Sequence, residues 1–496
     1  MMPLGMGADP SGEEQQKEAL HEFEGFVECP LFSGECKISI EKDGLSITSL
    51  FQQLPVHYGE ISAMEWRNYQ VALKTAAGEI IISRMGQEAQ WLYEKLYASY
   101  NDAVLKALYV SGEVLLETTG EYTALEEGIS HQGEAILRLY EDCLCILPPN
   151  DKARRLPLCF FAKAQREDYT YQITLATGEQ YGLSRLGYGL DELERMLRDL
   201  FYQLRTRTSS WQKELAPGLS SLQAATAAGL MTLGRAADYQ KLKTAAPPLA
   251  AALEEKLGKS RIAGTWSWLC KLNGGEGLML GAMPAPEQDT AEGDMASLMG
   301  SLDLSAVKEK LIPGGQTAEA GEGEEQEILA EPLPILWLIA PDEKKRLAAV
   351  ELALADNEAA ATYLYRIEGD WLTFAGKIDR ALEACAFHRE VIFLPEEKLN
   401  THKHLADAMV ITRTPVLGTL RRAFAGRAIH TSFERWMRDI EKCRDGLEHT
   451  TKGAAPMQAA QGADGAQEPK TKFCTSCGAK LQPEAKFCGQ CGTIQQ

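Results

Sequence analysis

Apolar and polar residues alternate in two widely separated segments of the chain. Residues 38–47 read Ile-Ser-Ile-Glu-Lys-Asp-Gly-Leu-Ser-Ile, and residues 137–146 read Leu-Arg-Leu-Tyr-Glu-Asp-Cys-Leu-Cys-Ile. Alternation on both sides of a polar turn is typical of a β-hairpin. Each segment is followed by a Leu-Pro step, at Leu54-Pro55 and Leu156-Pro157, and then by strands that break at Gly-Glu and end in Ser-Arg-Met-Gly or Ser-Arg-Leu-Gly. The pattern predicts an internal repeat.

An amphipathic helix closes both copies of the repeat. Residues 89–97 and 191–201 place apolar side chains at helical spacing, and Asp191 is expected to cap the second helix. Several short strands followed by one helix resemble the pleckstrin-homology-like fold, a strongly bent sheet whose open end is covered by a helix. The resemblance is one of pattern rather than of signature residues, and two copies of another small α+β unit are the alternative. It implies pleckstrin-like repeats at residues 20–108 and 130–208.

The chain then changes character twice. Residues 211–257 have a helical pattern rich in Ala and Leu, with a helix expected to begin at Pro247-Pro248, so a helical connector region is predicted over residues 211–283. Residues 284–330 are acidic and rich in Gly and Ala. Such a composition cannot bury enough apolar surface to fold, so this segment is predicted to be a disordered linker.

Regular structure is expected again over residues 333–449, as a further α+β domain. The apolar residues 335–339 predict a buried strand, whereas residues 347–354, rich in Ala and Leu, predict a helix. Residues 361–367 fit either a strand or a helix, because periodicity does not decide between the two. Residues 450–470 are rich in Gly, Ala, Gln and Pro, which predicts a second, flexible linker.

One seven-residue phrase occurs twice near the C-terminus. Lys-Phe-Cys-Thr-Ser-Cys-Gly at residues 472–478 returns as Lys-Phe-Cys-Gly-Gln-Cys-Gly at residues 486–492. Four cysteines in this C-x2-C-x10-C-x2-C spacing make a tetrahedral thiolate site for zinc. The candidate metal ligands are Cys474, Cys477, Cys488 and Cys491.

This motif resembles the small zinc-ribbon modules at the ends of many bacterial and archaeal proteins. Residues 471–496 are therefore expected to form a zinc ribbon with one structural Zn2+. Four cysteine ligands leave no open position for water, so the ion is not expected to be catalytic. The alternatives are a redox dithiol, which needs a neighbouring strand–helix–strand pattern, and two disulfides in a secreted tail, which need a secretion signal. Neither of those signals is visible in the sequence.

Taken together, the patterns predict an α+β multidomain protein. Two tandem small β-rich domains, each closed by a helix, are followed by a helical connector, a further α+β region and a C-terminal zinc ribbon.

The chain as a whole is acidic. Among 496 residues, 51 Lys and Arg against 70 Asp and Glu give a net charge of -19. This balance disfavours nonspecific binding to nucleic acid or to an anionic membrane. Residues 1–16 show no signal peptide, and no apolar run approaches the roughly 18 residues that a membrane span needs. Twelve cysteines without a secretion signal indicate a reducing, cytoplasmic location.

One segment departs from this acidic character. Residues 413–438 carry six arginines interleaved with aromatic residues. These candidate binding residues are Arg413, Arg421, Arg422, Arg427, Arg435 and Arg438. A basic segment with aromatics is typical of surfaces that bind RNA, DNA or an acidic partner. The alternative, which we favour, is an amphipathic helical pair whose arginines are solvated or pair with acids such as Glu434 and Asp439.

A smaller basic group lies in the second repeat, at Lys152, Arg154 and Arg155. Lipid binding by a pleckstrin-like domain needs a cluster of Lys and Arg in a loop between its first strands. The first repeat offers only Lys42 near its hairpin. We therefore favour a solvated turn over a lipid site at residues 152–155.

These features favour a nonenzymatic, zinc-binding cytoplasmic adaptor or scaffold that acts through protein–protein interactions. One alternative is a nucleic-acid-associated protein that uses the zinc ribbon and the basic segment 413–438. A second alternative is an enzyme housed in residues 333–445, although no nucleophile elbow, phosphate loop or helical pair of metal-binding histidines is visible there.

Overall fold

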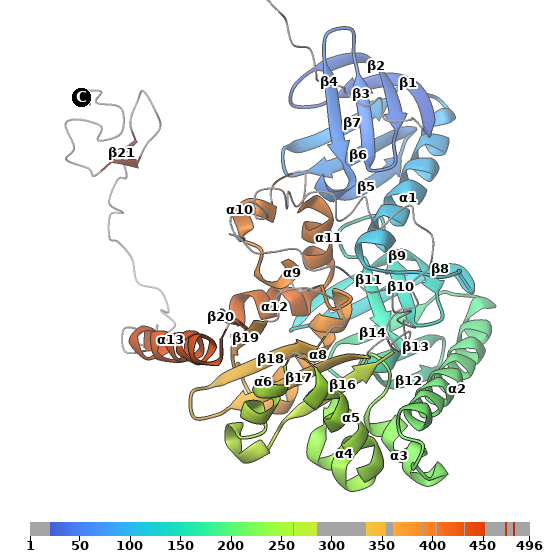
Figure 1. Ribbon diagram of the computed structural model, residues 1–496. Coiled ribbons are helices and arrows are strands. Elements are labelled where there is room, and N and C mark those ends of the chain that lie inside the picture. The colour runs from blue at the N-terminus through green and yellow to red at the C-terminus, as the bar shows by residue number, and fades with distance from the viewer. Residues whose placement is uncertain are drawn as a thin grey trace, which may run out of the picture. The chain divides into compact units, whose positions relative to one another are not determined.

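Figure 1 shows the computed structural model of the chain. It describes residues 20–260, 262–284, 334–353, 361–388, 390–399, 401, 404–430, 432–451, 472–473 and 480–481. The chain divides into two compact units, Met1–Arg444 and Asp445–Gln496. Nearly all of both predicted linkers lies outside the described residues.

The first repeat is a seven-stranded antiparallel sheet followed by a helix. Its strand order is β4-β3-β2-β1-β7-β6-β5. The elements are β1 His21–Glu28, β2 Ser33–Ile40, β3 Gly44–Thr48, β4 Gln53–His57, the 3-10 turn η1 Tyr58–Glu60, β5 Ile61–Arg67, β6 Gln70–Thr75, β7 Gly78–Ser83 and α1 Glu88–Ala107. Leu92, Leu96 and Tyr100 recur on one face of α1 and are fully buried, because this face packs into the core of the sheet.

The second repeat has the same order, β11-β10-β9-β8-β14-β13-β12, so each strand takes the place of the strand seven labels earlier. Its elements are β8 Leu116–Glu126, β9 Ile129–Leu139, β10 Cys143–Leu147, β11 Arg154–Pro157, the 3-10 turn η2 Leu158–Phe160, β12 Phe161–Glu167, β13 Thr170–Leu175, β14 Gln180–Ser184 and α2 Gly189–Leu215. The register shifts at the start of both β5 and β12, between Ile61 and Ala63 and between Phe161 and Lys163. The predicted repeat is confirmed, with the strands and closing helix that the resemblance implied, but the second copy extends beyond the expected residues 130–208, from β8 at Leu116 to the end of α2 at Leu215.

Both predicted hairpins are present. Ile40 lies opposite Leu45 in the first, and Leu139 lies opposite Leu144 in the second. The predicted helix cap is wrong, because α2 begins at Gly189 and Asp191 lies within its first turn. A negative charge there still complements the positive end of the helix dipole.

The Leu-Pro steps of the two copies are not equivalent positions. Pro55 lies opposite Ser46 in the first repeat. In the second repeat, the residue that corresponds to Ser46 is Cys145, and Arg155 lies opposite it. The position in the second repeat that is equivalent to Pro55 is therefore Arg155 rather than Pro157.

A third, six-stranded antiparallel sheet has the order β15-β16-β17-β18-β19-β20. Its strands are β15 Ala237–Asp238, β16 Met279–Met283, β17 Ile335–Asp342, β18 Leu347–Ala353, β19 Ala361–Arg366 and β20 Phe424–Ile429. The sheet takes β15 and β16 from the predicted helical connector and the other strands from the predicted α+β domain. These two regions of the sequence therefore share one sheet.

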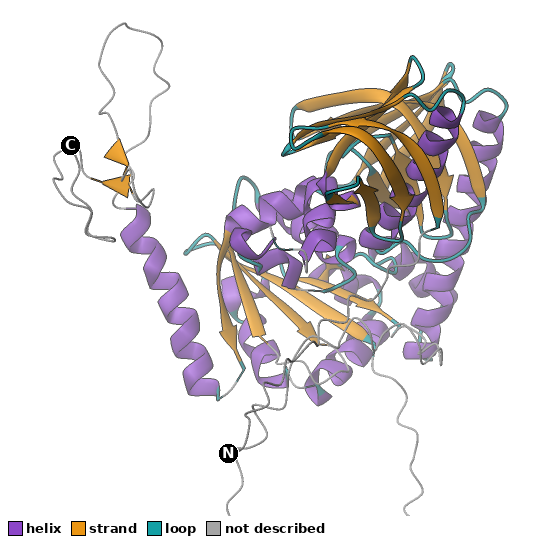
Figure 2. Ribbon diagram, turned by 90° about the horizontal axis from the view of Figure 1, so that it is seen from above, coloured by secondary structure: helices purple, strands orange, loops and turns teal. Residues whose placement is uncertain are grey.

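Of the segment 347–354, predicted to be a helix, residues 347–353 form strand β18. All seven of its residues are buried. Val350 and Leu352 face one core, and Ala349 and Ala353 face another. Helices cover both faces of this sheet (Figure 2), so its strands lack the alternating polar positions that mark a half-exposed strand. Burial on both faces overrides the helix propensity of Ala and Leu. The strand predicted at 335–339 is confirmed as β17.

The helices divide between the two faces of the third sheet. Those whose side chains join the core of the first repeat are α8 Trp371–Ala384, α9 Glu390–Phe393, α11 Leu405–Arg413 and α12 Pro415–Ala423, with the short α10 Glu396–Leu399 beside them. Those that pack on the other face are α3 Ser221–Leu230, α4 Tyr239–Ala245, α5 Pro247–Lys259, α6 Ala263–Leu269 and the first turns of α13 Phe433–Thr451, with the 3-10 turn η3 Leu272–Gly275. The helix expected to begin at Pro247-Pro248 is confirmed as α5.

A glycine makes room for the largest side chain of this core. Gly281 on β16 lies opposite Trp337 on β17. A Cβ atom at Gly281 would lie 2.0 Å from Cε2 of the Trp337 ring. Because Trp337 is fully buried and its Nε1 donates to Asp379 Oδ1 at 2.7 Å, the ring has little freedom to move aside.

The substitution Gly281→Ala is expected to lower the free energy of unfolding by about 1–3 kcal/mol, since overpacking forces a buried ring or the backbone to shift. Urea unfolding followed by circular dichroism measures the change. The matched control is Gly258→Ala in α5, where no atom lies within 4 Å of the added methyl. The control should be neutral or stabilising by up to about 1 kcal/mol. Equal losses in both variants would contradict the steric argument.

Candidate functional site

The C-terminal unit contributes two short strands to the described part of the chain. β21 Lys472–Phe473 pairs antiparallel with β22 Lys480–Leu481, with Phe473 opposite Lys480. The first C-x-x-C pair lies between these strands in the sequence. All four predicted zinc ligands, Cys474, Cys477, Cys488 and Cys491, lie outside the described residues.

Two of the six candidate arginines have partners inside the fold. Arg413, 2% exposed, donates from Nη2 to the Tyr100 hydroxyl at 2.6 Å. Arg421 donates to the backbone oxygens of Val391 and Leu394, at 2.9 and 2.7 Å, and so satisfies carbonyls at the end of α9. Both side chains stabilise the body of the protein, and neither is presented for binding.

The other four arginines lie at the surface. Arg422 donates to Thr419 Oγ1 at 3.0 Å, and the guanidinium of Arg427 lies 4.7 Å from the centre of the Phe393 ring. Arg435 and Arg438 are exposed on α13. The expected partner Asp439 instead accepts from Lys442 at 3.2 Å. The six arginines therefore do not form one common site.

The predicted solvated turn at residues 152–155 is wrong for its two arginines. Arg154 is 5% exposed and binds Glu126 with two donors, from Nε to Oε1 and from Nη2 to Oε2, each at 2.7 Å. The Tyr181 hydroxyl donates to Glu126 Oε1 at 2.6 Å. Burial by itself would raise the pKa of Glu126, but the hydrogen bonds and charge of Arg154 outweigh it and hold that pKa below its usual value. The carboxylate stays ionised and the pair is internal.

Arg155 joins the second repeat to helix α8. Its Nη1 lies 2.5 Å from Glu383 Oε1, and its Nη2 donates to Asp142 Oδ2 at 2.8 Å. Arg380 binds the other oxygen of Glu383 at 2.7 Å and donates to the backbone oxygen of Arg155 at 2.7 Å. A buried charge is costly unless it is paired, and here each buried charge has an opposite partner.

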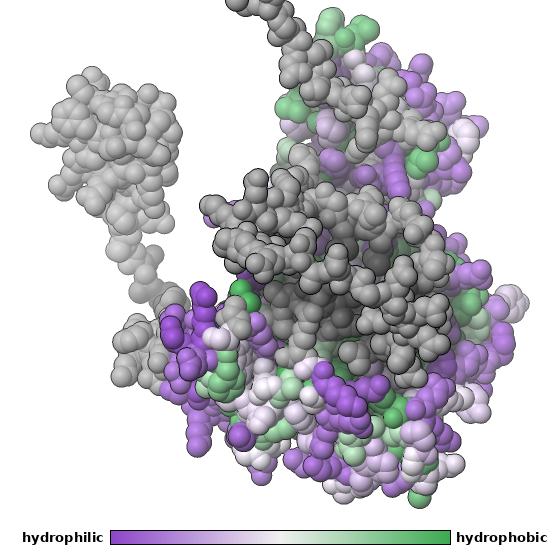
Figure 3. Space-filling model, viewed as in Figure 1, coloured by the Kyte–Doolittle hydropathy of each residue, from purple (hydrophilic) through white to green (hydrophobic). Residues whose placement is uncertain are grey.

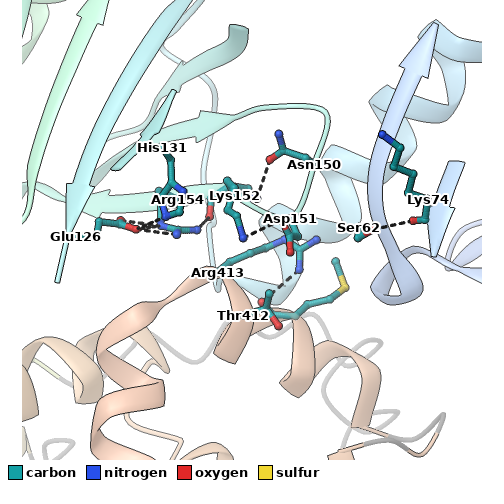
Figure 4. Close-up of polar contacts among 12 residues, drawn as sticks. Ser62, Lys74, Glu126, His131, Asn150, Asp151, Lys152, Arg154, Thr412 and Arg413 are labelled. Atoms are coloured by element: carbon teal, nitrogen blue, oxygen red, sulfur yellow. Dashed lines mark hydrogen bonds and ion pairs between the residues drawn. The ribbon is translucent and has the colours of Figure 1, made fainter. Parts of the chain in front are cut away.

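The loop between β10 and β11 also pairs with the first repeat (Figure 4). Met64 N donates to Pro149 O at 2.8 Å, Asp151 N donates to Ser62 O at 3.0 Å, and Ala63 bridges Asn150 in antiparallel fashion. β5 is the last strand of its sheet, so this loop occupies the outer edge of β5. An edge strand carries unpaired backbone groups, and the loop satisfies them as an added strand would.

Two tyrosines of α1 hold the same loop from the other side. The Tyr97 hydroxyl donates to Leu147 O, and the Tyr100 hydroxyl donates to Asn150 O at 3.1 Å. Arg413 in turn binds Tyr100, so the loop, α1 and α11 meet at one point. We call this contact between the 148–152 loop, β5 and α1 the repeat junction.

The sequence analysis missed a buried carboxylate–imidazole pair in the third sheet. Glu351 on β18 is fully buried, and its Oε1 lies 2.9 Å from His430 Nε2. Thr362 donates to the same oxygen and accepts from Trp436 Nε1 at 2.7 Å. No local signal reveals the pair, because Glu351 lies in a segment that resembles a helix and His430 follows much later in the chain.

Comparison with known proteins decides the nature of the C-terminal segment. Residues 473–494 match the zinc-ribbon domain. This confirms the predicted zinc ribbon. Its domain type implies zinc binding by this segment.

Comparisons of the chain with curated proteins and with solved structures identify no family for the remaining residues. No curated protein matches the chain. Forty-three chains of solved structures match it. One belongs to the structure of the Spt16D Pob3N heterodimer, with 16% sequence identity and a TM-score of 0.15, and the match covers 33% of this chain and 86% of that chain. Within the part that the structure describes, no helix is both long and apolar enough to cross a membrane.

Asp379 lies on α8 near the ion-pair group of Arg380 and Glu383, and it makes the stability of the fold depend on pH. Burial raises its pKa to about 7, although hydrogen bonds from Ala236 N and Trp337 Nε1 act in the opposite direction. The folded state therefore holds a proton that the unfolded chain releases near pH 4. The contribution of Asp379 to stability is complete below about pH 4 and is lost as the pH rises toward 7.

We expect wild type and Asp379→Asn to differ in the pH dependence of unfolding. Between pH 4 and 7, the free energy of unfolding of the wild type should fall relative to the variant, by a few kcal/mol in total. Urea unfolding at several pH values measures this difference. Parallel curves would show that Asp379 is ionised throughout this range.

Proposed function

We propose that this chain is a nonenzymatic, zinc-binding cytoplasmic adaptor that acts through protein–protein contacts. The match of residues 473–494 to the zinc-ribbon domain carries the proposal. Four thiolates around one Zn2+ complete the coordination, so the metal would serve the fold and the ribbon surface would contact the partner. A module this small needs its metal to fold, which makes zinc a condition for binding.

The placement of the basic residues supports a protein partner over nucleic acid. Arg413, Arg421, Arg154 and Arg155 are engaged within the fold. The net charge of the whole chain is strongly negative, at -19. Phosphate binding requires a concentrated positive surface, and the six arginines of residues 413–438 do not form one common site. Eight free cysteines in the described residues support a reducing compartment.

The Glu351–His430 pair is the one observation that favours the enzyme alternative, since a carboxylate and an imidazole together suit acid–base chemistry. Its surroundings favour a structural role. The His430 side chain is 14% exposed, and Thr265 and Thr362 lie at its two ring nitrogens, at 3.4 and 3.2 Å. We therefore retain the adaptor as the function that the chain supports best.

Zinc content tests the metal. The wild-type chain should hold one Zn2+ after dialysis, whereas Cys474→Ser/Cys477→Ser should hold none, because two oxygen ligands cannot replace the thiolates. Inductively coupled plasma mass spectrometry gives the ratio of metal to protein. Cys29→Ser, a free thiol of the body, is the control and should retain the metal. Equal zinc in the double variant and the wild type would refute these ligands.

Co-purification tests the partner. Tagged full-length chain is isolated from its native cells, beside the Cys474→Ser/Cys477→Ser variant, with and without nuclease. A protein lost only from the double variant is the expected result. Partners that disappear on nuclease treatment, with binding that weakens steeply as salt rises, would establish the nucleic-acid alternative instead.

A further inference from the structure

The two repeats meet through unlike surfaces. The second repeat contributes its loop between the third and fourth strands, and the first repeat contributes the edge of its fifth strand. A contact between different surfaces of two similar units is heterologous. Among the described residues, it leaves one surface of each kind unused, namely the third-to-fourth turn of the first repeat and the fifth-strand edge of the second.

The unused turn is residues 49–52 of the first repeat. Ser49 N donates to Gln52 O at 2.8 Å, and Gln52 N donates to Ser49 Oγ at 3.1 Å, so the turn is closed by its own hydrogen bonds. Leu50 and Phe51 at its tip are 92% and 94% exposed. Figure 3 shows an apolar area at the upper end of the first repeat, where Figure 1 labels β3 and β4. A preformed turn that holds two large apolar side chains in water is typical of a contact surface.

The unused edge is β12. It is the last strand of its sheet, and no other strand in the described part of the chain pairs with its outer side. Its backbone groups that correspond to Ser62 O and Met64 N are Ala162 O and Ala164 N. Ala162 and Lys163 are exposed and Ala164 is half-buried. Short side chains leave these backbone groups accessible to an incoming turn.

Helix α2, beside β12, carries different side chains from α1 at the positions of the two tyrosines that hold the loop at the repeat junction. Counted from the shared Ser-Arg-x-Gly corner, Tyr97 and Tyr100 of α1 correspond to Arg198 and Phe201 of α2. Phe201 packs against Phe161 of β12, with ring centres 5.5 Å apart. Where Tyr97 donates to Leu147 O, α2 carries the exposed Arg198, whose guanidinium also binds Glu194 at 3.3 Å. Phe161 and Phe201 thus form an apolar surface beside the charged Arg198, and this surface suits the apolar side chains at the tip of the turn.

We infer that the chain associates with a second copy of itself, with the turn 49–52 of one copy docked on the outer edge of β12 in the other. The contact places the apolar tip of the turn on the edge that corresponds to β5 at the repeat junction, and each copy offers both of the surfaces that the junction leaves unused. Each docked copy again offers a free turn and a free edge, so association continues beyond the dimer into rings or open chains. With a net charge of -19 on each copy, salt should strengthen association by screening repulsion.

Sedimentation velocity of the full-length chain, over a range of concentrations, tests this inference. The wild type should show species above the 54.6 kDa monomer that grow with concentration. Phe51→Asp should weaken association at least tenfold, because it places a charge in the apolar contact. Ala164→Pro should do the same by removing the edge N–H, which an edge strand tolerates. Circular dichroism confirms that each variant is folded.

The decisive sample is a mixture of the two variants. Phe51→Asp retains an intact edge and Ala164→Pro retains an intact turn, so together they should form a one-to-one dimer and nothing larger. Tyr188→Asp, a 96% exposed aromatic outside both surfaces, is the control and should associate as the wild type does. Cys474→Ser/Cys477→Ser should also associate normally, which separates this inference from the proposed role of the ribbon.

Three outcomes would overturn the inference. The first is a wild type that stays monomeric at every concentration. The second is association that survives both substitutions. The third is variants that remain monomers when mixed, which would mean that the turn and the edge meet some other occupant.

Discussion

An unpaired strand edge must find partners for its backbone groups, and the arrangement of the repeats depends on how β5 meets this requirement. The 148–152 loop supplies an acceptor for Met64 N and a donor for Ser62 O. Tyr97 and Tyr100 then hold the back of the loop, and Arg413 holds Tyr100. A single edge thus links both repeats and α11 through hydrogen bonds that a solvent-exposed loop would give to water.

The two arginines that follow the loop bind different parts of the protein, because successive strand residues point to opposite faces of a sheet. Arg154 turns into its own sheet and meets Glu126, whereas Arg155 turns outward and meets Glu383 of α8. The Arg154–Glu126 pair holds the start of β11, and the Arg155–Glu383 pair holds helix α8 against the second repeat. A stretch of basic residues that resembles a lipid-binding or solvated loop therefore serves as an internal joint.

The sequence predicted the features that local patterns encode. Alternation revealed the hairpins at residues 38–47 and 137–146, and cysteine spacing revealed the zinc ribbon. Prediction failed at β18, because a strand buried on both faces has no alternation to detect. It failed again at the arginines, since Arg155 and Glu383 are 228 residues apart and Arg413 and Tyr100 are 313 apart. Which arginines bind and which support the fold is decided by those distant partners.

The repeat junction also sets an order of events during synthesis. The first repeat emerges from the ribosome with all of its own strands, yet the loop that covers β5 is translated roughly 40 residues after the end of α1, a delay on the order of a few seconds. For that interval the nascent chain carries an open edge able to pair with any extended segment nearby.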